Sequence, residues 1–481
     1  MPGLVVAIVL GFSLLLVHYT LRSQPMPTTR PLDVDENLPL PWLAQTSAVF
    51  SLTGLFGGYF GVAVALGLPA IGGLAVGTVL GLFLVRHWIT STLATKPNPR
   101  FEDFLFRVLD GHHSNRIVYV LTIVLCQCLF ATSELLIFRE LARVALSLKS
   151  EQATLLTVCV GIIGYYYILH GGYLALFRTD VVQLLLVAIM TIAASAFLVI
   201  NHANVAWTSA LLPRPGYWEF PLLGSGRPVY FYHFVIAMIT GLGLLLSSPD
   251  TWKRVYQVNR MDQKPLTRVL TFLGVGVLPY LVLLPVALML SLNVDRQVKR
   301  SFTLPPALSD NHVFIAAALG LIASFLSAFN GAMLASVHLG MMLYRRINPV
   351  PSEALRFYSF MMIVLVIICA LFAGGVALFS NPAVIDFTNP WVLGNMLIGG
   401  PAAVTGVQIG TAGNISRLPK YALQWILGLG IIIWIVYFLQ SPGYSKTPTI
   451  ESVKTVPVAV GVCLLTAILS RIVILGGQKR A

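Results

Sequence analysis

Charged residues are scarce in this 481-residue sequence, at only 10% of the total. Soluble domains carry roughly 25% charged residues, so the chain has too little polar surface for a soluble protein of its size. Hydrophobic residues make up 57% of the sequence, and the mean hydropathy is +0.83. The composition therefore excludes a soluble globular domain and predicts an integral protein of the lipid bilayer.

Cysteine is also scarce, and the usual elements of a catalytic or metal site are missing. The five cysteines show no spacing typical of a zinc site, and all of them fall in apolar segments, where cysteine packs as a small hydrophobic residue. The sequence has no His-rich cluster, no nucleophile motif and no paired catalytic carboxylates in its apolar segments. We therefore expect no enzyme and no organic cofactor.

Long apolar runs, by contrast, are abundant. A membrane-spanning helix needs about 20 mostly apolar residues. About thirteen segments meet this requirement: 3–21, 42–63, 67–86, 117–138, 153–170, 180–200, 231–248, 267–292, 312–343, 357–379, 390–410, 421–440 and 455–476.

The excess of positive charge predicts how these segments cross the membrane. The net charge is +13, and with the N-terminus outside, the inside loops hold about twice as many Lys and Arg residues as the outside loops, as the positive-inside rule requires. We predict a multi-pass protein of the plasma (inner) membrane with an external N-terminus and a cytoplasmic C-terminus, and no nucleic-acid partner. Because Met1–Val17 lacks Lys and Arg, the segment 3–21 is interpreted as an anchor helix rather than a cleaved signal peptide.

Helix-breaking residues are concentrated in two matching places. Many transporters consist of inverted repeats whose first helices are broken near the middle of the membrane. With the segment 3–21 set aside, the segment 42–63 contains FSLTGLFGGYFG, and the segment 231–248 leads into ITGLGLLLSSPD. These two segments begin two five-helix halves. Glycine and proline also serve as packing residues in membrane helices, but the matched pair favours a binding site between two repeats.

Four stretches resemble a known family. GGYLALFRTDVVQ, at 171–183, resembles the signature of the sodium:solute symporter family, in which a Gly-Gly turn leads into Thr-Asp-x-x-Gln at the start of helix 5. KPNPRFEDFLFRVLDG, at 96–111, resembles the family's amphipathic segment before helix 3 and predicts a short amphipathic helix on the cytoplasmic surface. PDTWKRVYQVNRMDQKPLTR, at 249–268, resembles the loop after helix 6, and 319–346 resembles helix 8.

The resemblance implies a LeuT-type fold and sodium-driven uptake of a small organic solute. The fold would be an all-α membrane protein with about 13 transmembrane helices, built on a 5+5 inverted-repeat core. The chain would then divide into five parts: an N-terminal anchor helix and cytoplasmic linker (1–39), a first inverted repeat (40–200), an external loop (201–230), a second inverted repeat (231–412) and two C-terminal helices (413–481).

The resemblance also implies a cation site between helices 1 and 8. In that family, backbone carbonyls of both helices and two hydroxyls of helix 8 hold a shared sodium ion. In this sequence the carbonyls fall on Ala44, Ser47 and Ala323, and one hydroxyl falls on Ser327. Leu326 stands at the second hydroxyl position. Oxygen ligands replace the water shell of a hard cation, so this departure predicts a weakened sodium site.

A second cation site of that family uses the helix 5 aspartate, which is Asp180 here. Its helix 8 hydroxyl positions read Phe329 and Asn330, so this site has also lost oxygen ligands. Asp180 is therefore either part of a cation or proton path or a cap on the first turn of its helix. Asp250, with the basic residues that follow it up to Arg254, predicts an exposed ion pair, which would contribute only about 0–1 kcal/mol to stability.

Polar and small residues within the predicted spans are candidates for solute binding. An ionisable residue at that depth is a functional candidate by default, and Glu134 would bind a substrate amine or carry a proton, unless it pairs with Arg139. The hydroxyls at the helix 1 break would contact the solute, unless they cap the local backbone. The expected solute-contacting residues are Ser51, Thr53, Ser133, Glu134 and Gly241.

Two functions from different classes fit these observations. The first is a secondary active transporter that couples uptake of a small organic solute to a cation gradient by alternating access, with sodium or a proton as the coupling ion. The second is a symporter-like membrane sensor or subunit that does not transport and works with a separate partner protein. The incomplete sodium sites motivate the second function, but the first is the main prediction.

Overall fold

The structure is a computed structural model of the 481-residue chain. It describes residues 60–94, 101–110, 112–145, 148–201, 230–260, 314–345, 390–410, 420–440 and 463–469, together with some isolated positions. Within these ranges every regular element is a helix, and no strand occurs. The principal helices are α3 (Phe60–Leu93), α4 (Phe101–Val108), α5 (His113–Ala145), α6 (Ser150–Asn201), α8 (Tyr230–Leu246), α9 (Pro249–Arg260), α11 (Phe314–Arg345), α14 (Pro390–Gly410) and α15 (Ala422–Gln440).

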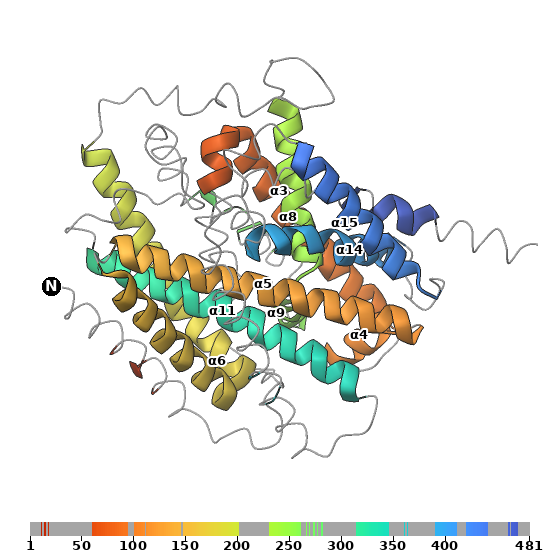
Figure 1. Ribbon diagram of the computed structural model, residues 1–481, viewed down its shortest axis with the longest axis horizontal. Coiled ribbons are helices and arrows are strands. Elements are labelled where there is room, and N and C mark those ends of the chain that lie inside the picture. The colour runs from red at the N-terminus through yellow and green to blue at the C-terminus, as the bar shows by residue number, and fades with distance from the viewer. Residues whose placement is uncertain are drawn as a thin grey trace, which may run out of the picture.

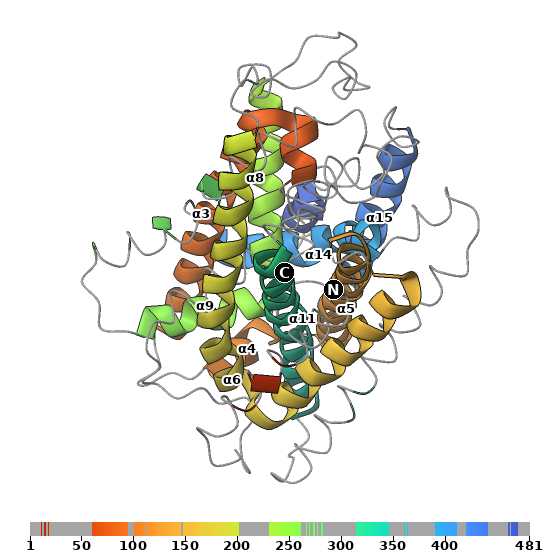
Figure 2. The same cartoon turned by 90° about the vertical axis from the view of Figure 1, so that its left-hand side faces the viewer.

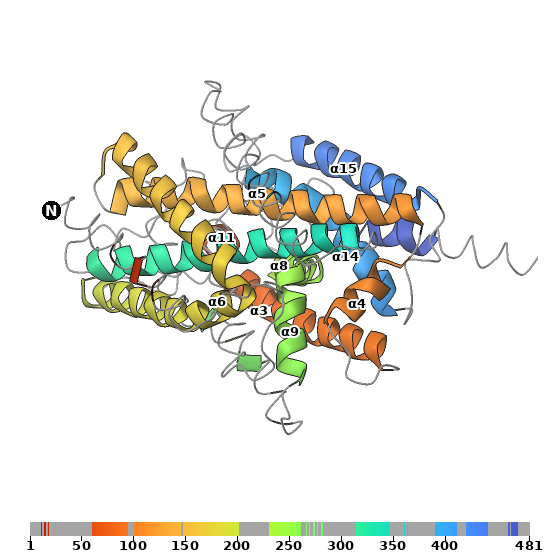
Figure 3. The same ribbon diagram turned by 90° about the horizontal axis from the view of Figure 1, so that it is seen from below.

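α11 is the central helix of the described part of the chain. It contacts α5 and α6 along its length and α4 and α9 at other points, and Figures 1 and 3 show α5 and α11 running side by side. Of its most apolar window, 94% is buried inside the protein, against 67% for α5 and 50% for α3. α3 packs along α8, and α14 contacts both α5 and α8. Polar residues on α11 are therefore held in the interior.

The described helices are those of a multi-pass membrane protein. Three of them are long and apolar enough to cross a bilayer, at Pro69–Leu93, His113–Arg143 and Leu319–Gly340, and a bent pair of helices makes a fourth span. α14 coincides with the predicted span 390–410, and α15 nearly coincides with 421–440. The predicted spans 3–21, 42–63, 267–292 and 357–379 lie almost wholly outside the described residues, as does much of 455–476.

Two predicted boundaries differ from the structure. α3 begins at Phe60, so the last residues of the predicted span 42–63 belong to the helix that follows it. The segments 153–170 and 180–200, predicted as separate helices, form the single 52-residue helix α6. α6 changes direction near its middle, so that its two halves form a V (Figure 2). The polar residues that suggested an interruption are accommodated within the helix, since the hydroxyl of Thr179 donates to the carbonyl of Leu176 at 2.9 Å.

α4 is the predicted amphipathic helix, and its apolar side is buried. Phe101, Phe104, Leu105 and Val108 are each at most 3% exposed. The ring of Phe104 lies edge-on to Trp88 of α3, with centroids 4.7 Å apart. Such an arrangement is favoured by the ring quadrupoles as well as by burial. α4 is therefore packed into the core that surrounds the broken span, rather than lying loosely on the surface.

Candidate functional site

The candidate site lies beside a sharp break between α8 and α9. α8 ends at Leu246, α9 begins at Pro249, and the two helices meet at 79° (Figure 2). The local sequence explains the restart. The hydroxyl of Ser248 accepts a hydrogen bond from the amide of Thr251 at 3.4 Å, which is an N-cap arrangement. Pro249 occupies the first helical position, where its missing N–H costs nothing.

The end of α8 is closed by a side chain from the next helix. Carbonyls at a helix C-terminus lack intrahelical partners, and the indole N–H of Trp252 donates to the carbonyl of Leu245 at 3.2 Å. The amide of Ser247 donates to the carbonyl of Gly243 at 3.1 Å. The Trp252 side chain is fully buried, and its ring lies 5.1 Å from that of Trp88. The break is therefore stabilised by specific hydrogen bonds to the carbonyls of Leu245 and Gly243.

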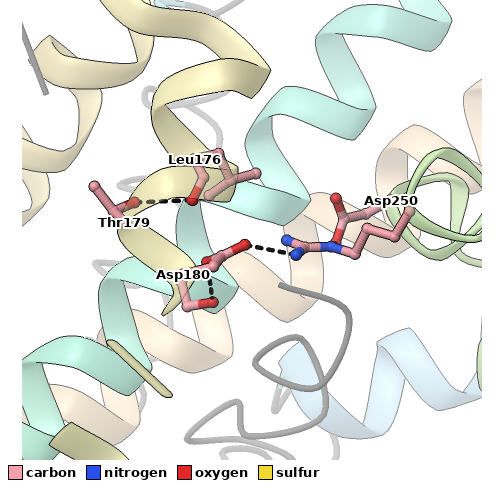
Figure 4. Close-up of polar contacts among 6 residues, drawn as sticks. Leu176, Thr179, Asp180 and Asp250 are labelled. Carbon is pink, nitrogen blue, oxygen red and sulfur yellow. Dashed lines mark hydrogen bonds and ion pairs between the residues drawn. The ribbon is translucent and has the colours of Figure 1, made fainter. Parts of the chain in front are cut away.

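A buried ion pair joins the second half of α6 to α9. Nη1 of Arg254 lies 2.5 Å from Oδ2 of Asp180, and the side chains are 1% and 0% exposed. The other carboxylate oxygen, Oδ1, accepts a hydrogen bond from the hydroxyl of Ser327 on α11 at 2.7 Å. In Figure 4, dashed lines leave the carboxylate of Asp180 in two directions. Both oxygens of one carboxylate are thus engaged, and three helices meet at this group.

Arg254 also binds a second carboxylate. Its Nε donates to Oδ2 of Asp250, one turn earlier on α9, at 2.8 Å. The ring of Phe177 lies 5.0 Å from its Cζ atom, within the range of a cation–π interaction. A Cβ on Gly331 would lie 3.2 Å from Oδ2 of Asp250, so a glycine on α11 makes room for the pair. Two carboxylates share one guanidinium here, and this group carries a formal charge of −1.

The burial of this pair corrects one prediction. Asp250 and Arg254 were expected to form an exposed pair in a loop after helix 6. The 79° bend instead brings α9 against α11, and Thr251 through Gln257 are each at most 8% exposed. Burying charges carries a large desolvation cost, which is offset only by close, well-oriented partners. The distances in this group meet that condition.

The structure brings together two of the five residues expected to hold a cation. Asp180 and Ser327 are hydrogen-bonded, and Ala323 is buried on α11 one turn before Ser327. Ala44 and Ser47 lie outside the described residues. Leu326 is also buried, and its Cδ2 lies 3.0 Å from the position of a Cβ on Gly164 in the first half of α6.

These residues fit sodium poorly. A sodium ion requires several oxygen ligands in place of its water shell. Two of the described side chains that offer oxygens at this point, Asp180 and Ser327, bind each other, and Asp180 also binds Arg254. A cation bound at Asp180 would lie close to a guanidinium.

The expected solute residues fall in different surroundings. Ser51 and Thr53 lie outside the described residues. Ser133 and Glu134 are buried on α5, and the Ser133 hydroxyl donates to the carbonyl of Leu129 in its own helix at 2.9 Å. A Cβ on Gly241 would lie 3.0 Å from a carbonyl oxygen of α3, so this glycine permits close packing of α3 and α8.

Sequence reasoning paired Arg254 with Asp250 but missed its pairing with Asp180, and it gave little weight to Gln183. Gln183 follows Asp180 by nearly one turn of α6 and is 1% exposed. Among the described residues, neither its Oε1 nor its Nε2 has a hydrogen-bond partner. It is therefore a further candidate for contact with a bound molecule.

Comparison with known proteins identifies the fold. No protein-family model matches the sequence, and neither does any curated protein. The structure is similar to that of a Na⁺-coupled sialic acid symporter in a substrate-bound outward-open state, with a TM-score of 0.56, 17% identity, and 97% of each chain covered. It is also similar to MhsT in complex with L-phenylalanine, with a TM-score of 0.51, 11% identity, and 90% of this chain and 99% of that chain covered.

A third similar structure supports the same assignment. Mhp1, a nucleobase-cation-symport-1 family transporter in a closed conformation with bromovinylhydantoin bound, matches with a TM-score of 0.50 and 11% identity, over 89% of this chain and 92% of that chain. All three have the LeuT-type fold. At these identities the likeness establishes the fold alone, and the chain is a membrane protein of that fold.

Proposed function

We propose that this chain is a secondary active transporter that couples uptake of a small organic solute to a cation gradient by alternating access. The observation that carries the proposal is the broken span α8–α9, whose second half is tied by Arg254 to α6 and α11. In transporters of this architecture the solute binds where the first helices of the repeats are unwound, because unwound backbone offers free polar groups at the midplane. The four sequence stretches that resemble the sodium:solute symporter family support a divergent member of that family.

Solutes of the similar structures support this class of cargo. One of those structures is a sialic acid symporter, MhsT is in complex with L-phenylalanine, and Mhp1 has bromovinylhydantoin bound. Each is a small organic molecule. In this chain the solute would lie among helix 1, α5 and α8, near Ser51, Thr53, Ser133, Glu134 and Gly241. The protein would lie in the plasma membrane with its N-terminus outside.

The coupling ion is either sodium or a proton. Ala44, Ser47, Ala323, Ser327 and Asp180 would form the cation path between helix 1, α6 and α11. Glu134, at 3% exposure on α5, offers a second carboxyl for proton movement. Binding of the ion would favour one orientation of the two repeats, and binding of the solute would favour the other.

A non-transporting sensor or subunit is the second candidate. One observation favours it: Leu326 supplies no oxygen where the family has a hydroxyl, and Asp180 is already bound by Arg254. A protein with such a site could bind a solute and change shape without driving flux. Its signal would then pass to a separate partner protein.

Two measurements on the purified full chain distinguish these functions. A thermal-shift screen of amino acids, sugars, sialic acids, nucleobases and other small organic solutes first identifies a molecule that binds. Uptake of that molecule, radiolabelled, is then measured in proteoliposomes with an imposed sodium gradient, proton gradient or neither, and in protein-free liposomes. Accumulation above the external concentration, abolished by an ionophore, supports transport. A molecule that binds but enters no faster than into protein-free liposomes contradicts transport and favours the sensor.

A further inference from the structure

In the predicted cation site, the aspartate is bound by a positively charged group of the chain itself. We propose that the guanidinium of Arg254 takes the place of a bound cation at the Asp180 carboxylate, so that this subsite does not respond to sodium. This inference rests on the proposed function, because it concerns which ion a transporter of this fold would use here. It departs from the sodium-binding role that the resemblance implies for the same residues.

The first observation in support of this proposal is that both oxygens of the Asp180 carboxylate are bound by side chains of the protein. Its Oδ2 faces Nη1 of Arg254 at 2.5 Å, and its Oδ1 accepts the Ser327 hydroxyl at 2.7 Å. The negative charge of this carboxylate is thus balanced by a positive charge from the chain. A sodium ion at the same carboxylate would have to displace the guanidinium or lie next to it, and like charges at close range in a buried site repel strongly.

The second observation is that the guanidinium of Arg254 is held in place by groups from three helices. Nε is held by Asp250 at 2.8 Å, the ring of Phe177 covers the planar group at 5.0 Å from Cζ, and Gly331 leaves the room that the pair occupies. A planar, permanently charged guanidinium suits such a site better than a compact ammonium group, because it donates in several fixed directions and stacks on aromatic rings. The site is therefore shaped for this side chain from three helices.

The third observation concerns two helix 8 positions that would supply further oxygen ligands. Leu326 packs toward Gly164 of α6, and the ring of Phe329 stacks on Phe325 with centroids 5.2 Å apart. Both side chains are buried. At two of the helix 8 positions where the family places hydroxyls for sodium this chain has apolar side chains, while Ser327 and Asn330 keep polar side chains at the other two. A positive charge is supplied from α9.

The proposal predicts how the chain responds to ions. Arg254 is tethered, always charged, and present at a fixed high local concentration, so the link among α6, α9 and α11 forms without an external cation. Removal of its charge would leave Asp180 and Asp250 as uncompensated buried carboxylates. Such a site should then attract an external cation, whether sodium or free guanidinium.

The test measures thermal unfolding of the purified full chain in sodium chloride and in N-methyl-D-glucamine chloride at equal ionic strength. Three proteins are compared: wild type, Arg254→Gln, and the matched control Lys253→Gln, which removes the neighbouring buried cation of α9 that lies 4.8 Å from the ring of Phe101. Millimolar guanidinium chloride serves as a second cation. The readout is binding to the protein, so it is independent of whether the chain transports a solute.

Each protein has its own expected result. The wild type should have the same midpoint of thermal unfolding in both salts. Arg254→Gln should be less stable, and its midpoint should rise saturably with sodium or guanidinium, whereas the midpoint of Lys253→Gln should show no such rise. A saturable, sodium-specific rise for the wild type that is lost in Asp180→Asn overturns the proposal. So does a folded Arg254→Gln protein that responds to neither cation. If Arg254→Gln does not fold, Arg254→Lys is used, and a sodium response in that charge-conserving variant counts against the proposal.

Discussion

Arg254 and Asp180 lie 74 residues apart in the sequence, yet their side chains form a buried ion pair at 2.5 Å. The pair connects the second half of a broken span to the adjoining leg of α6, and Ser327 adds α11 to the same group. A helix that is free at its break would move independently of its neighbours. This pair instead makes the position of α9 depend on two other helices, so the movement of α9 is coupled to theirs.

The strength of that coupling is measurable by a double-mutant cycle. Arg254→Gln alone should lower the free energy of unfolding by about 3–5 kcal/mol, because it leaves buried carboxylates without their partner. Asp180→Asn and Arg254→Gln together should cost less than the sum of the single changes, by about 0.5–3 kcal/mol. Unfolding in detergent by heat or denaturant checks both values. Additive effects would show that the two side chains do not interact.

The hydrogen bonds that cap the two helices at the break can also be tested by substitution. Ser248→Ala removes the oxygen that accepts the Thr251 amide and should cost about 0.5–2 kcal/mol. Trp252→Phe keeps an aromatic ring but leaves the Leu245 carbonyl without the indole donor, and should cost about 1–3 kcal/mol. Trp425→Phe is the control, since Trp425 is 77% exposed on α15. Equal stability of all three variants would contradict the role given to the caps.

Gly331 should not tolerate a side chain. Gly331→Ala would place a Cβ 3.2 Å from Oδ2 of Asp250 and 3.8 Å from Nη2 of Arg254, so the ion pair must shift and the protein should lose stability. Gly428→Ala on α15 is the matched control, because nothing lies within 4 Å of its added Cβ. At that helical position alanine should be neutral or stabilise by up to about 1 kcal/mol. The difference between the two unfolding midpoints is the measurement.

Gln183 offers a way to separate function from stability. Because its carboxamide is buried with no hydrogen-bond partner among the described residues, Gln183→Leu should preserve or raise the free energy of unfolding, by up to about 1–3 kcal/mol. If the carboxamide serves a bound solute, the same change should weaken solute binding and uptake. Thr191→Val, on the same helix, is the control, since that hydroxyl donates to the Val187 carbonyl of its own helix at 2.8 Å. Unchanged solute affinity in Gln183→Leu would show that Gln183 does not contact the solute.

Several elements could be predicted from the sequence because their signals are local. α14 and α15 follow uninterrupted apolar runs, and the amphipathic pattern at Phe101, Phe104 and Leu105 predicts α4. The break after α8 was also predicted, from the glycines and the proline of ITGLGLLLSSPD at 239–250. The LeuT-type fold was implied by the resemblance to the sodium:solute symporter family, and the similar structures confirm that fold.

The electrostatic part of the site could not be predicted in the same way. α9 carries Lys253, Arg254 and Asp250, and a charged segment after an apolar one is normally exposed. Its burial depends on the 79° bend and on the packing of α11, which are tertiary properties. The pairing of Arg254 with Asp180 likewise depends on how α6 turns back, and the sequence contains no local signal for that.

The central claim is that two inverted repeats meet at broken first helices, with the solute site between the breaks. An experimental density map of the full chain in lipid nanodiscs tests it most directly at residues 42–63. The account predicts two half-helices interrupted within 50–61, facing the α8–α9 break at Ser247–Pro249, with Ser51 and Thr53 between them. A continuous helix through 42–63, or an interruption that faces away from α8 and α9, would contradict it.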